Sequence, residues 1–438
     1  MMTLGALLLL AAGCQKEPER PLSANHAMER RSHASRFESE VPIDWMNMHI
    51  RIMSTTSLPN VSFIRPLAYS GIAFYESVLP GMPSFQTLSG QLTDLPAMPA
   101  ADNRLEYYWP ASANAAFASI LKQMYPMTST ANQNAIDSLE AALNASFASE
   151  STAEIVTRSA NFGKAIAQIV FDWSETDGYK HAFDAYPLPT GPGMWIPTPP
   201  AFAAASAPYW KDLRKMIAAS DDNAQPPAPT PYSEDPSSDF YKDALAVYQA
   251  SLALDADQVN QAMYYRDIPG ITSGGHFLNI LKQVLEIEKP SLEFTASATA
   301  LTGITIFDAT ISCWKTKYTY NQIRPVSYIR SVMGHSTWLP LLATPAHPEY
   351  SSAHAVLSGA NAEALTSLFG EGYAFTDHTY DYLGFPPRSF SSFREAGEDA
   401  GNSRLYAGIH YPRSIAAGLT QGRTVAANVL SHLVLKKP

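Results

Sequence analysis

The sequence predicts an all-α protein, and three observations support that class. Apolar residues recur at intervals of three and four through most of the chain from Val41 onwards, which is the spacing of one helix face. No two neighbouring segments combine strict alternation with the turn residues of a hairpin. Two proline-rich stretches, 186–210 and 225–238, interrupt the pattern, because proline denies a helix its backbone donors. We therefore expect two helical bundles with long Pro-rich loops.

Helical periodicity occurs in separate segments along the chain. Trp195 and Trp210 indicate that the first proline-rich loop is ordered, since a long loop is otherwise either functional or disordered. We place an N-terminal bundle at residues 41–222 and a C-terminal bundle at residues 239–438, divided within 223–238. The predicted helices lie within residues 46–79, 111–125, 136–147, 153–173, 239–254, 275–288, 292–320, 354–370 and 415–435.

Composition limits the classes of function. The chain has 438 residues with 46% hydrophobic content, which is enough for a large core. Thirty Lys and Arg against 40 Asp and Glu give a net charge of -10, which argues against nucleic acid or an acidic membrane surface as the main partner. Any anion site must therefore be built locally.

The N-terminal segment resembles a bacterial lipoprotein signal. "MMTLGALLLLAAGC" is too short to span a bilayer and places small residues directly before Cys14. We expect a signal peptide at 1–13, lipidation of Cys14 and a polar tether at 14–40. Gln15 after the cysteine favours the outer membrane or periplasm, and a secreted protein is the alternative. No other membrane contact is expected.

The segment "KTKYTYNQIRPVSYIR" contains two basic residues seven positions apart. On a continuous helix, Lys317 and Arg324 would share one face about 10.5 Å apart, so their side chains could converge on one point. Pro325 limits this helix, because the residue before proline is pushed away from helical angles.

Two further segments hold polar residues near predicted helix ends. In "HPEYSSAHA" we expect a helix to begin near Ala353, which leaves backbone N–H groups, the Ser352 hydroxyl and His354 at its start. In "SRLYAGIHYPRS" Gly408 ends a helix, so that Arg404 and His410 can face one cavity. Ser414 is then available to N-cap the next helix.

The three basic side chains predict an oxoanion site. A single Lys or Arg side chain usually lies on the solvated surface of a protein. Buried together without an anion, the three charges would carry a prohibitive desolvation cost. With a bound oxoanion, each charge-assisted hydrogen bond contributes about 1.5 to 3 kcal/mol.

Read in order, the segments form K-x6-R-P, S-S-A-H and S-R-x5-H. This pattern resembles the signature of the vanadium-dependent haloperoxidases and the related type 2 phosphatidic acid phosphatases, K-x6-R-P, P-S-G-H and S-R-x5-H-x3-D. "AYSGIAFYESVLPG" and "WIPTPPAF" also look like segments of bacterial haloperoxidase-type members. The resemblance therefore covers Val41 to the C-terminus and implies two helical bundles of that type.

The resemblance implies vanadate as the cofactor, in a site that phosphate could also occupy. Lys317, Arg324 and Arg404 would hold the equatorial oxygens. Ser352 and the Ala353 N–H would donate hydrogen bonds to the same oxygens.

The two histidines of the motif would carry the chemistry. His410 would be the axial ligand of vanadium, or the phosphorylated nucleophile of a phosphatase. His354 would be the acid–base residue. The partners implied are hydrogen peroxide, a halide and a small organic substrate. His347 stands where bromide-selective members carry histidine, so bromide or iodide is favoured, although a solvated loop residue is an equal interpretation.

Three positions depart from the family pattern. Ser351 replaces a proline, which should loosen the loop, and Ala353 replaces a glycine, which costs energy if the loop needs positive φ. Ser414 replaces an aspartate that could orient His410. The alternatives are therefore an acid phosphatase acting through a phosphohistidine, and a catalytically weakened envelope lipoprotein. Chain length favours the haloperoxidase over the phosphatase.

Overall fold

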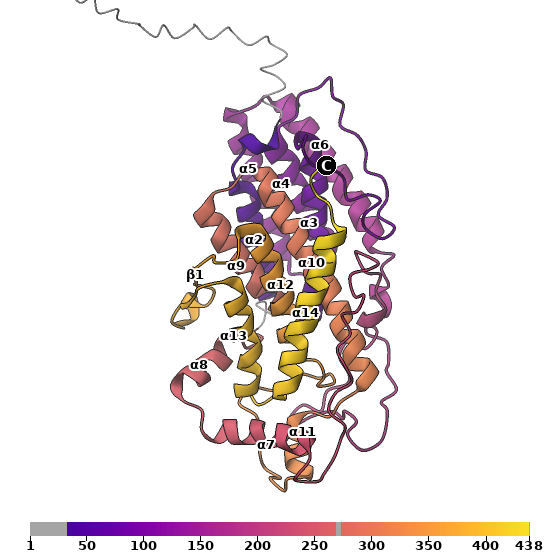
Figure 1. Ribbon diagram of the computed structural model, residues 1–438. Coiled ribbons are helices and arrows are strands. Elements are labelled where there is room, and N and C mark those ends of the chain that lie inside the picture. The colour runs from indigo at the N-terminus through magenta and orange to yellow at the C-terminus, as the bar shows by residue number, and fades with distance from the viewer. Residues whose placement is uncertain (1–32, 269–272, 438) are drawn as a thin grey trace, which may run out of the picture.

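The structure is a computed structural model and describes residues 33–268 and 273–437 (Figure 1). These residues confirm the predicted all-α class. The α-helices are α2 (Glu40–Thr55), α3 (Ile64–Val78), α4 (Trp109–Met124), α5 (Thr130–Ser146), α6 (Ala153–Ser174), α7 (Asp239–Leu252), α8 (Ala256–Tyr264), α9 (Ser273–Glu288), α10 (Leu292–Tyr320), α11 (Pro325–Ser331), α12 (Ala353–Phe369), α13 (Phe393–Tyr406) and α14 (Pro412–His432).

A small antiparallel sheet accompanies the helices. Strand β1 (Phe375–Asp377) pairs with β2 (Arg388–Phe390), with Phe375 opposite Phe390. This sheet was not predicted, because strands of three residues are too short to show an alternating pattern. It lies at the edge of the molecule near α9 and α13 (Figure 1).

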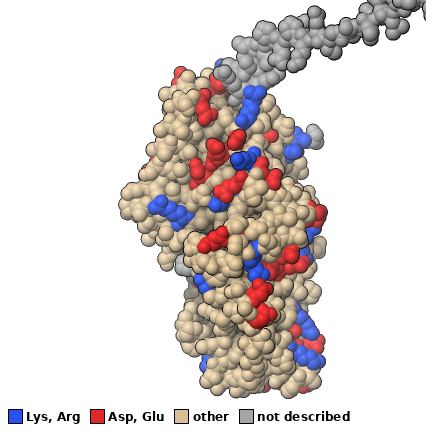
Figure 2. All heavy atoms as spheres, turned by 90° about the vertical axis from the view of Figure 1, so that its left-hand side faces the viewer, with Lys and Arg blue, Asp and Glu red and all other residues tan. Residues whose placement is uncertain are grey.

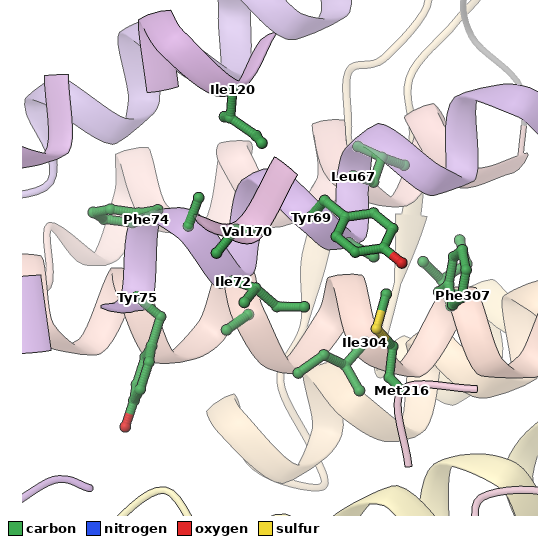
Figure 3. Close-up of a cluster of buried hydrophobic side chains, with 14 of the residues drawn as sticks. Leu67, Tyr69, Ile72, Phe74, Tyr75, Ile120, Val170, Met216, Ile304 and Phe307 are labelled. Atoms are coloured by element: carbon green, nitrogen blue, oxygen red, sulfur yellow. The ribbon is translucent and has the colours of Figure 1, made fainter. Parts of the chain in front are cut away.

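Helix α10 runs through the middle of the molecule (Figure 1). It packs against α3 and also against α12 and α14. Figure 3 shows the apolar cluster between α3 and α10, where the Tyr69 ring lies next to the Phe307 ring. The helices of both halves thus share one apolar core, and the boundary within 223–238 stays a prediction.

The length and composition of α10 would also suit a membrane-crossing helix, and among the described residues it is the one helix with this property. However, 94% of its most apolar window is buried inside the protein. A long core helix meets the same criteria, and the packing of α10 accounts for its apolar character.

Helices α12 and α14 cross at very short range because glycine stands at their contact. A Cβ atom at Gly418 would lie 2.8 Å from the Ser352 carbonyl oxygen, a distance that real Cβ atoms do not adopt. The close approach brings the start of α14 against the start of α12.

The first proline-rich stretch covers the segment between α10 and α11. Trp195 and Trp210 are buried, as predicted for an ordered loop. The Trp195 N–H donates to the Asn321 carbonyl at 2.6 Å, and the Ser206 N–H donates to the Ala346 carbonyl at 2.7 Å. This loop is therefore fixed to both segments that lead into the predicted site.

The predicted signal peptide, Cys14 and residues 15–32 of the tether lie outside the described residues. Residues 34–40 belong to the folded body: Ala34 is fully buried, and the Leu292 N–H donates to the Phe37 carbonyl at 2.7 Å. The folded body thus begins before Val41, within the segment that was predicted as a tether up to residue 40.

On the face in Figure 2, basic and acidic side chains are interspersed.

Candidate functional site

The predicted site residues come from four different segments. Lys317 lies in the last turn of α10, and that helix ends at Tyr320 because Asn321 adopts a left-handed conformation with φ of 47°. Arg324 is the N-cap of α11. The prediction that Lys317 and Arg324 share one continuous helix is therefore wrong, since Asn tolerates the left-handed turn that separates them.

The Lys317 ammonium is fully buried and points at the loop before α12. Its Nζ donates to the carbonyl oxygens of Pro348 and Glu349 at 3.0 Å and of Ser351 at 2.5 Å. Three acceptors match the three donors of an ammonium group. Lys317 thus fixes the loop that carries the S-S-A-H motif.

The Arg324 guanidinium is also fully buried and lies between two histidines. Its Nη1 lies 3.1 Å from Nε2 of His410, and its Nη2 lies 3.0 Å from Nδ1 of His347. Its Nε donates to the His347 carbonyl at 2.9 Å, and Nη1 also donates to the Ile409 carbonyl at 2.9 Å. Lys317 and Arg324 therefore converge on the same loop despite their separate helices.

Arg404 and His354 meet at one backbone carbonyl. Nη2 of Arg404 donates to the Tyr265 oxygen at 2.8 Å, and Nε2 of His354 lies 3.1 Å from the same oxygen. Asp267 Oδ1 lies 3.5 Å from His354 Nε2. Because a carbonyl oxygen can only accept, the proton of neutral His354 is on Nε2 and its lone pair on Nδ1.

The turn between α13 and α14 brings His410 into the site. Gly408 has φ of 78° and ends α13, as predicted. The N-cap of α14 is Tyr411 with Pro412 following it, so the prediction that Ser414 caps this helix is wrong. Proline is favoured at the first helical position. Because Pro412 takes that position, the N-cap is the residue directly before it, Tyr411.

A carboxylate contacts His410 although Ser414 replaces the motif aspartate. Oε1 of Glu349 lies 2.7 Å from Nδ1 of His410 and accepts the Tyr411 N–H at 3.0 Å. Glu349 is fully buried. The sequence contained a signal for it, since Glu349 lies within "HPEYSSAHA", the segment that carries Ser352 and His354.

The S-S-A-H residues occupy the start of α12. Ser352 is the N-cap and Ala353 the first helical residue, as predicted. Among the described residues the Ser352 Oγ is buried without a hydrogen-bond partner. Ala353 has no positive φ, so its methyl group causes no backbone strain. Ser351 is held rather than loosened, because its hydroxyl donates to Gln421 Oε1 at 2.6 Å.

A cavity of about 220 Å³ joins the two histidines. Both His354 and His410 line it, together with His347 and Trp314. Other lining residues come from the first half of the chain and from the proline-rich loop: Asn60, Val61, Ile64 and Ser206. Lys317, Arg324 and Arg404 do not line the cavity themselves. Arg324 contacts His410, which does line it.

Burial dominates the electrostatics of the site. Desolvation lowers the pKa of Lys317 to about 7, and lowers that of Arg324 and Arg404 to about 10. Desolvation, followed by the nearby Arg charges, holds the pKa of His354 and His410 well below the usual value. The histidines are therefore neutral, and the cations gain from any further negative charge.

The residues fit a tetrahedral oxoanion. Two guanidinium groups and an ammonium group lie around the cavity, the Ser352 hydroxyl lacks a partner, and His410 lines the cavity. An oxoanion supplies both the negative charge and the acceptors that such donors need. Among the described residues no group of three or more His, Cys, Asp or Glu side chains is arranged for a metal cation.

Sequence reasoning missed two other groups besides Glu349. The Tyr265 carbonyl and Asp267 follow α8, outside every quoted motif. Every residue has a backbone carbonyl, so the sequence does not show which carbonyl will accept a hydrogen bond. The contact of the Tyr265 carbonyl could therefore not have been predicted. Asp267 precedes His354 by 87 positions and is linked to it only by the fold.

Comparisons with known proteins show which fold and family the chain is similar to. The family model for the VCPO second helical-bundle domain matches residues 297–435. A bacterial vanadium-dependent iodoperoxidase structure shares 29% identity, covering 92% of this chain and 98% of that chain with a TM-score of 0.84. No curated protein matches the chain.

Two bacterial vanadium-dependent chloroperoxidase structures share the fold at lower identity. The holo-type structure is 15% identical with a TM-score of 0.67, covering 86% of this chain and 95% of that chain. The apo-type structure is 14% identical with a TM-score of 0.66, covering 87% and 95%.

The fold is the helical-bundle fold of the vanadium haloperoxidases. The motif residues from Lys317 to His410 all lie within the matched domain. The second half of the chain thus matches a vanadium haloperoxidase domain, and the whole fold is similar to that of a bacterial vanadium-dependent iodoperoxidase.

Proposed function

We propose that the protein is a vanadium-dependent haloperoxidase that oxidises bromide or iodide with hydrogen peroxide. The oxidised halogen would then react with a small organic substrate. The observation that carries this proposal is one cavity lined by His354 and His410, with Arg404 and Arg324 directly behind these histidines. A phosphate or vanadate ion there would lie against His354 and His410 and would be attracted by the positive charge close to them.

The groups that would hold vanadate are all near the cavity. Lys317, Arg324 and Arg404 supply positive charge, and the Ser352 hydroxyl and the Ala353 N–H supply further donors at the start of α12. His410 supplies a ring nitrogen. Vanadate, when bound, activates hydrogen peroxide towards a halide.

His354 is suited to move the proton of hydrogen peroxide. Its Nε2 donates to the Tyr265 carbonyl, which leaves the lone pair of Nδ1 as the proton acceptor. Asp267 at 3.5 Å from Nε2 would stabilise the imidazolium that forms. This arrangement supports His354 as the acid–base residue.

The preference for bromide or iodide rests on two supports. His347 lines the same cavity as His354 and His410, so it is not a solvated loop residue. The structure with a TM-score of 0.84 is named an iodoperoxidase. His347 can therefore contribute a polar hydrogen to the volume in which a halide would react.

A paired assay tests the proposed function. Vanadate-loaded protein is assayed with peroxide and bromide or iodide, and vanadate-free protein is assayed with a phosphomonoester. We expect halide oxidation and no phosphatase turnover. Phosphatase turnover without halide oxidation would indicate the acid phosphatase instead, and failure of both assays would indicate a weakened binding protein.

Two variants separate the roles of the histidines. His410→Ala should lose vanadate binding, because it removes the ring nitrogen proposed to hold the anion. His354→Ala should retain vanadate and lose halide oxidation by about 100-fold or more, the usual contribution of a general acid–base group. Both variants at wild-type activity would show that the site is assigned wrongly.

A further inference from the structure

Glu349 is a buried carboxylate for which the family signature has no position. Its Oε1 contacts both Nδ1 of His410, at 2.7 Å, and the Tyr411 N–H, at 3.0 Å. The two contacts come from consecutive residues at the start of α14. Glu349 therefore ties the loop before α12 to the histidine that lines the cavity.

The contacts of Oε1 determine where His410 carries its proton. The Tyr411 N–H can only donate, so Oε1 acts as an acceptor. With Glu349 ionised, Nδ1 of the neutral imidazole donates to Oε1, and the lone pair is on Nε2. Arg324 Nη1, which can only donate, lies 3.1 Å from that Nε2 and independently requires the same tautomer.

The position of Ser414 explains why the carboxylate comes from another segment. Ser414 lies in the first turn of α14, four residues after His410, and is buried. Burial raises the pKa of Glu349 to about 7, and the positive charges of Arg324 and Lys317 oppose that rise together with the nearby Tyr411 N–H and Ser414 hydroxyl, so Glu349 and Ser414 are neighbours. The space around His410 is thus shared by a short serine from α14 and a longer glutamate from the loop.

Glu349 has opposite effects on two kinds of oxoanion. Its negative charge disfavours every anion in the site. Its hydrogen bond to Nδ1 makes His410 Nε2 a better ligand, which favours an anion whose central atom accepts a nitrogen. Vanadate accepts such a ligand, whereas phosphate at equilibrium binds through charge and hydrogen bonds alone.

We propose that Glu349 is a positioning residue that fixes His410 Nε2 as a ligating nitrogen and thereby makes the site select vanadate over phosphate. This inference rests on the proposed function, since it concerns the same cavity. It concerns equilibrium binding, however, and does not require halide turnover.

The test compares the binding of two anions to one variant. Vanadate and inorganic phosphate are titrated separately by calorimetry into the full chain and into Glu349→Gln. We expect vanadate binding to weaken about 10- to 100-fold, the usual effect of losing such a support. Phosphate binding should stay unchanged or become tighter. Equal weakening of both anions, or no change for vanadate, would overturn the proposal.

Glu76→Gln is the matched control. Glu76 is also a buried carboxylate that accepts a backbone N–H, that of Leu88. It lies 12 residues along α3 from Ile64, which lines the cavity, or about 18 Å at the rise of a helix. Glu76→Gln should leave the ratio of the two affinities unchanged.

A measurement on the unmodified protein decides the case even if Glu349→Gln does not fold. Nitrogen NMR of 15N-histidine-labelled protein, with His410 assigned by the loss of its signals in His410→Gln, should show the proton on Nδ1. A proton on Nε2 would overturn the proposal. If the wild-type protein oxidises halide but Glu349→Gln leaves the ratio of vanadate to phosphate affinity unchanged, this inference alone is rejected. If Glu349→Gln changes that ratio as expected but the wild-type protein does not oxidise halide, the proposed function alone is rejected.

Discussion

Nη2 of Arg324 lies 3.0 Å from Nδ1 of His347. Nδ1 also lies 3.2 Å from the Pro348 carbonyl oxygen, which can only accept, whereas the guanidinium can only donate. The shorter contact, to the charged guanidinium, favours Nδ1 as the acceptor and places the proton of neutral His347 on Nε2. Burial, and then the charges of Lys317 and Arg324, keep the pKa of His347 well below its usual value. His347 therefore both supports Arg324 and faces the cavity, and its effect on halide choice is not separate from oxoanion binding.

Replacing His347 should separate these two effects. His347→Phe removes the acceptor, and the remaining contact of Arg324 Nη2 is the Pro345 carbonyl at 3.4 Å. We expect vanadate affinity to fall about 10-fold or more, since a charge-assisted hydrogen bond contributes about 1.5 to 3 kcal/mol. His347→Gln retains an acceptor and should recover part of the affinity. A changed halide KM with wild-type vanadate affinity would contradict the role of His347 at Arg324.

Ser352→Ala should lose function while the unliganded protein stays as stable or gains stability. The Ser352 Oγ is buried without a partner among the described residues, and an unsatisfied buried hydroxyl costs about 1 to 3 kcal/mol. We expect a thermal midpoint without ligand that is unchanged or higher, together with weaker vanadate and phosphate binding. Ser77→Ala is the control, since that buried hydroxyl donates to the Phe74 carbonyl and its loss should lower the midpoint. A lower midpoint in Ser352→Ala with wild-type anion affinity would reject this role.

Restoring the family glycine at position 353 should not improve the enzyme. Ala353 begins α12 without positive φ, so the glycine would relieve no strain. Glycine in a helix costs roughly 0.5 to 1 kcal/mol relative to alanine. Ala353→Gly should therefore lower the free energy of unfolding by up to about that amount and leave halide turnover at or below the wild-type level. A gain in turnover at constant stability would show that the methyl group obstructs the site.

Most of the fold could be predicted, because helical periodicity is a local property of the sequence. The segment 46–79 was predicted as one helical run, but it contains α2 and α3 with a break around Pro59, where proline ends the local helix. The two strands Phe375–Asp377 and Arg388–Phe390 were missed because each has three residues and their pairing joins positions that are not local in the sequence, such as Phe375 and Phe390. The packing of both halves on α10 is tertiary and has no local signal.

The sequence motifs named the residues of the candidate site, whereas their contacts came only from the structure. Lys317 and Arg324 do converge, but through a turn at Asn321 and separate helices. Ser414 suggested a missing carboxylate, and the structure supplies one from Glu349. A sequence motif gives the residue types at fixed positions. Only the fold shows that a carboxylate from another segment takes the place next to His410.

A pH effect on stability should come from a histidine far from the motif residues. His49 is buried against Tyr125, with its Nε2 2.8 Å from the phenol oxygen, and desolvation lowers its pKa to about 3 from 6.5. Below pH 6.5 the unfolded chain therefore gains a proton that the folded protein does not. The contribution of His49 to stability is complete above pH 6.5 and is lost as the pH falls towards 3, on the order of 4 to 5 kcal/mol in total.

The comparison of two histidine variants isolates this effect from the titration of the carboxylates. In urea unfolding at a series of pH values, His49→Gln should be less stable than the wild type at pH 7, because the packed imidazole is lost. Its stability should then fall less steeply between pH 6.5 and 4. His432→Gln, at an exposed position, should retain the wild-type pH dependence. If the stability of His49→Gln fell with pH as steeply as that of the wild type, this prediction would be wrong. The wild-type protein would then bind a proton at His49 without unfolding, which would require water to reach this buried side chain.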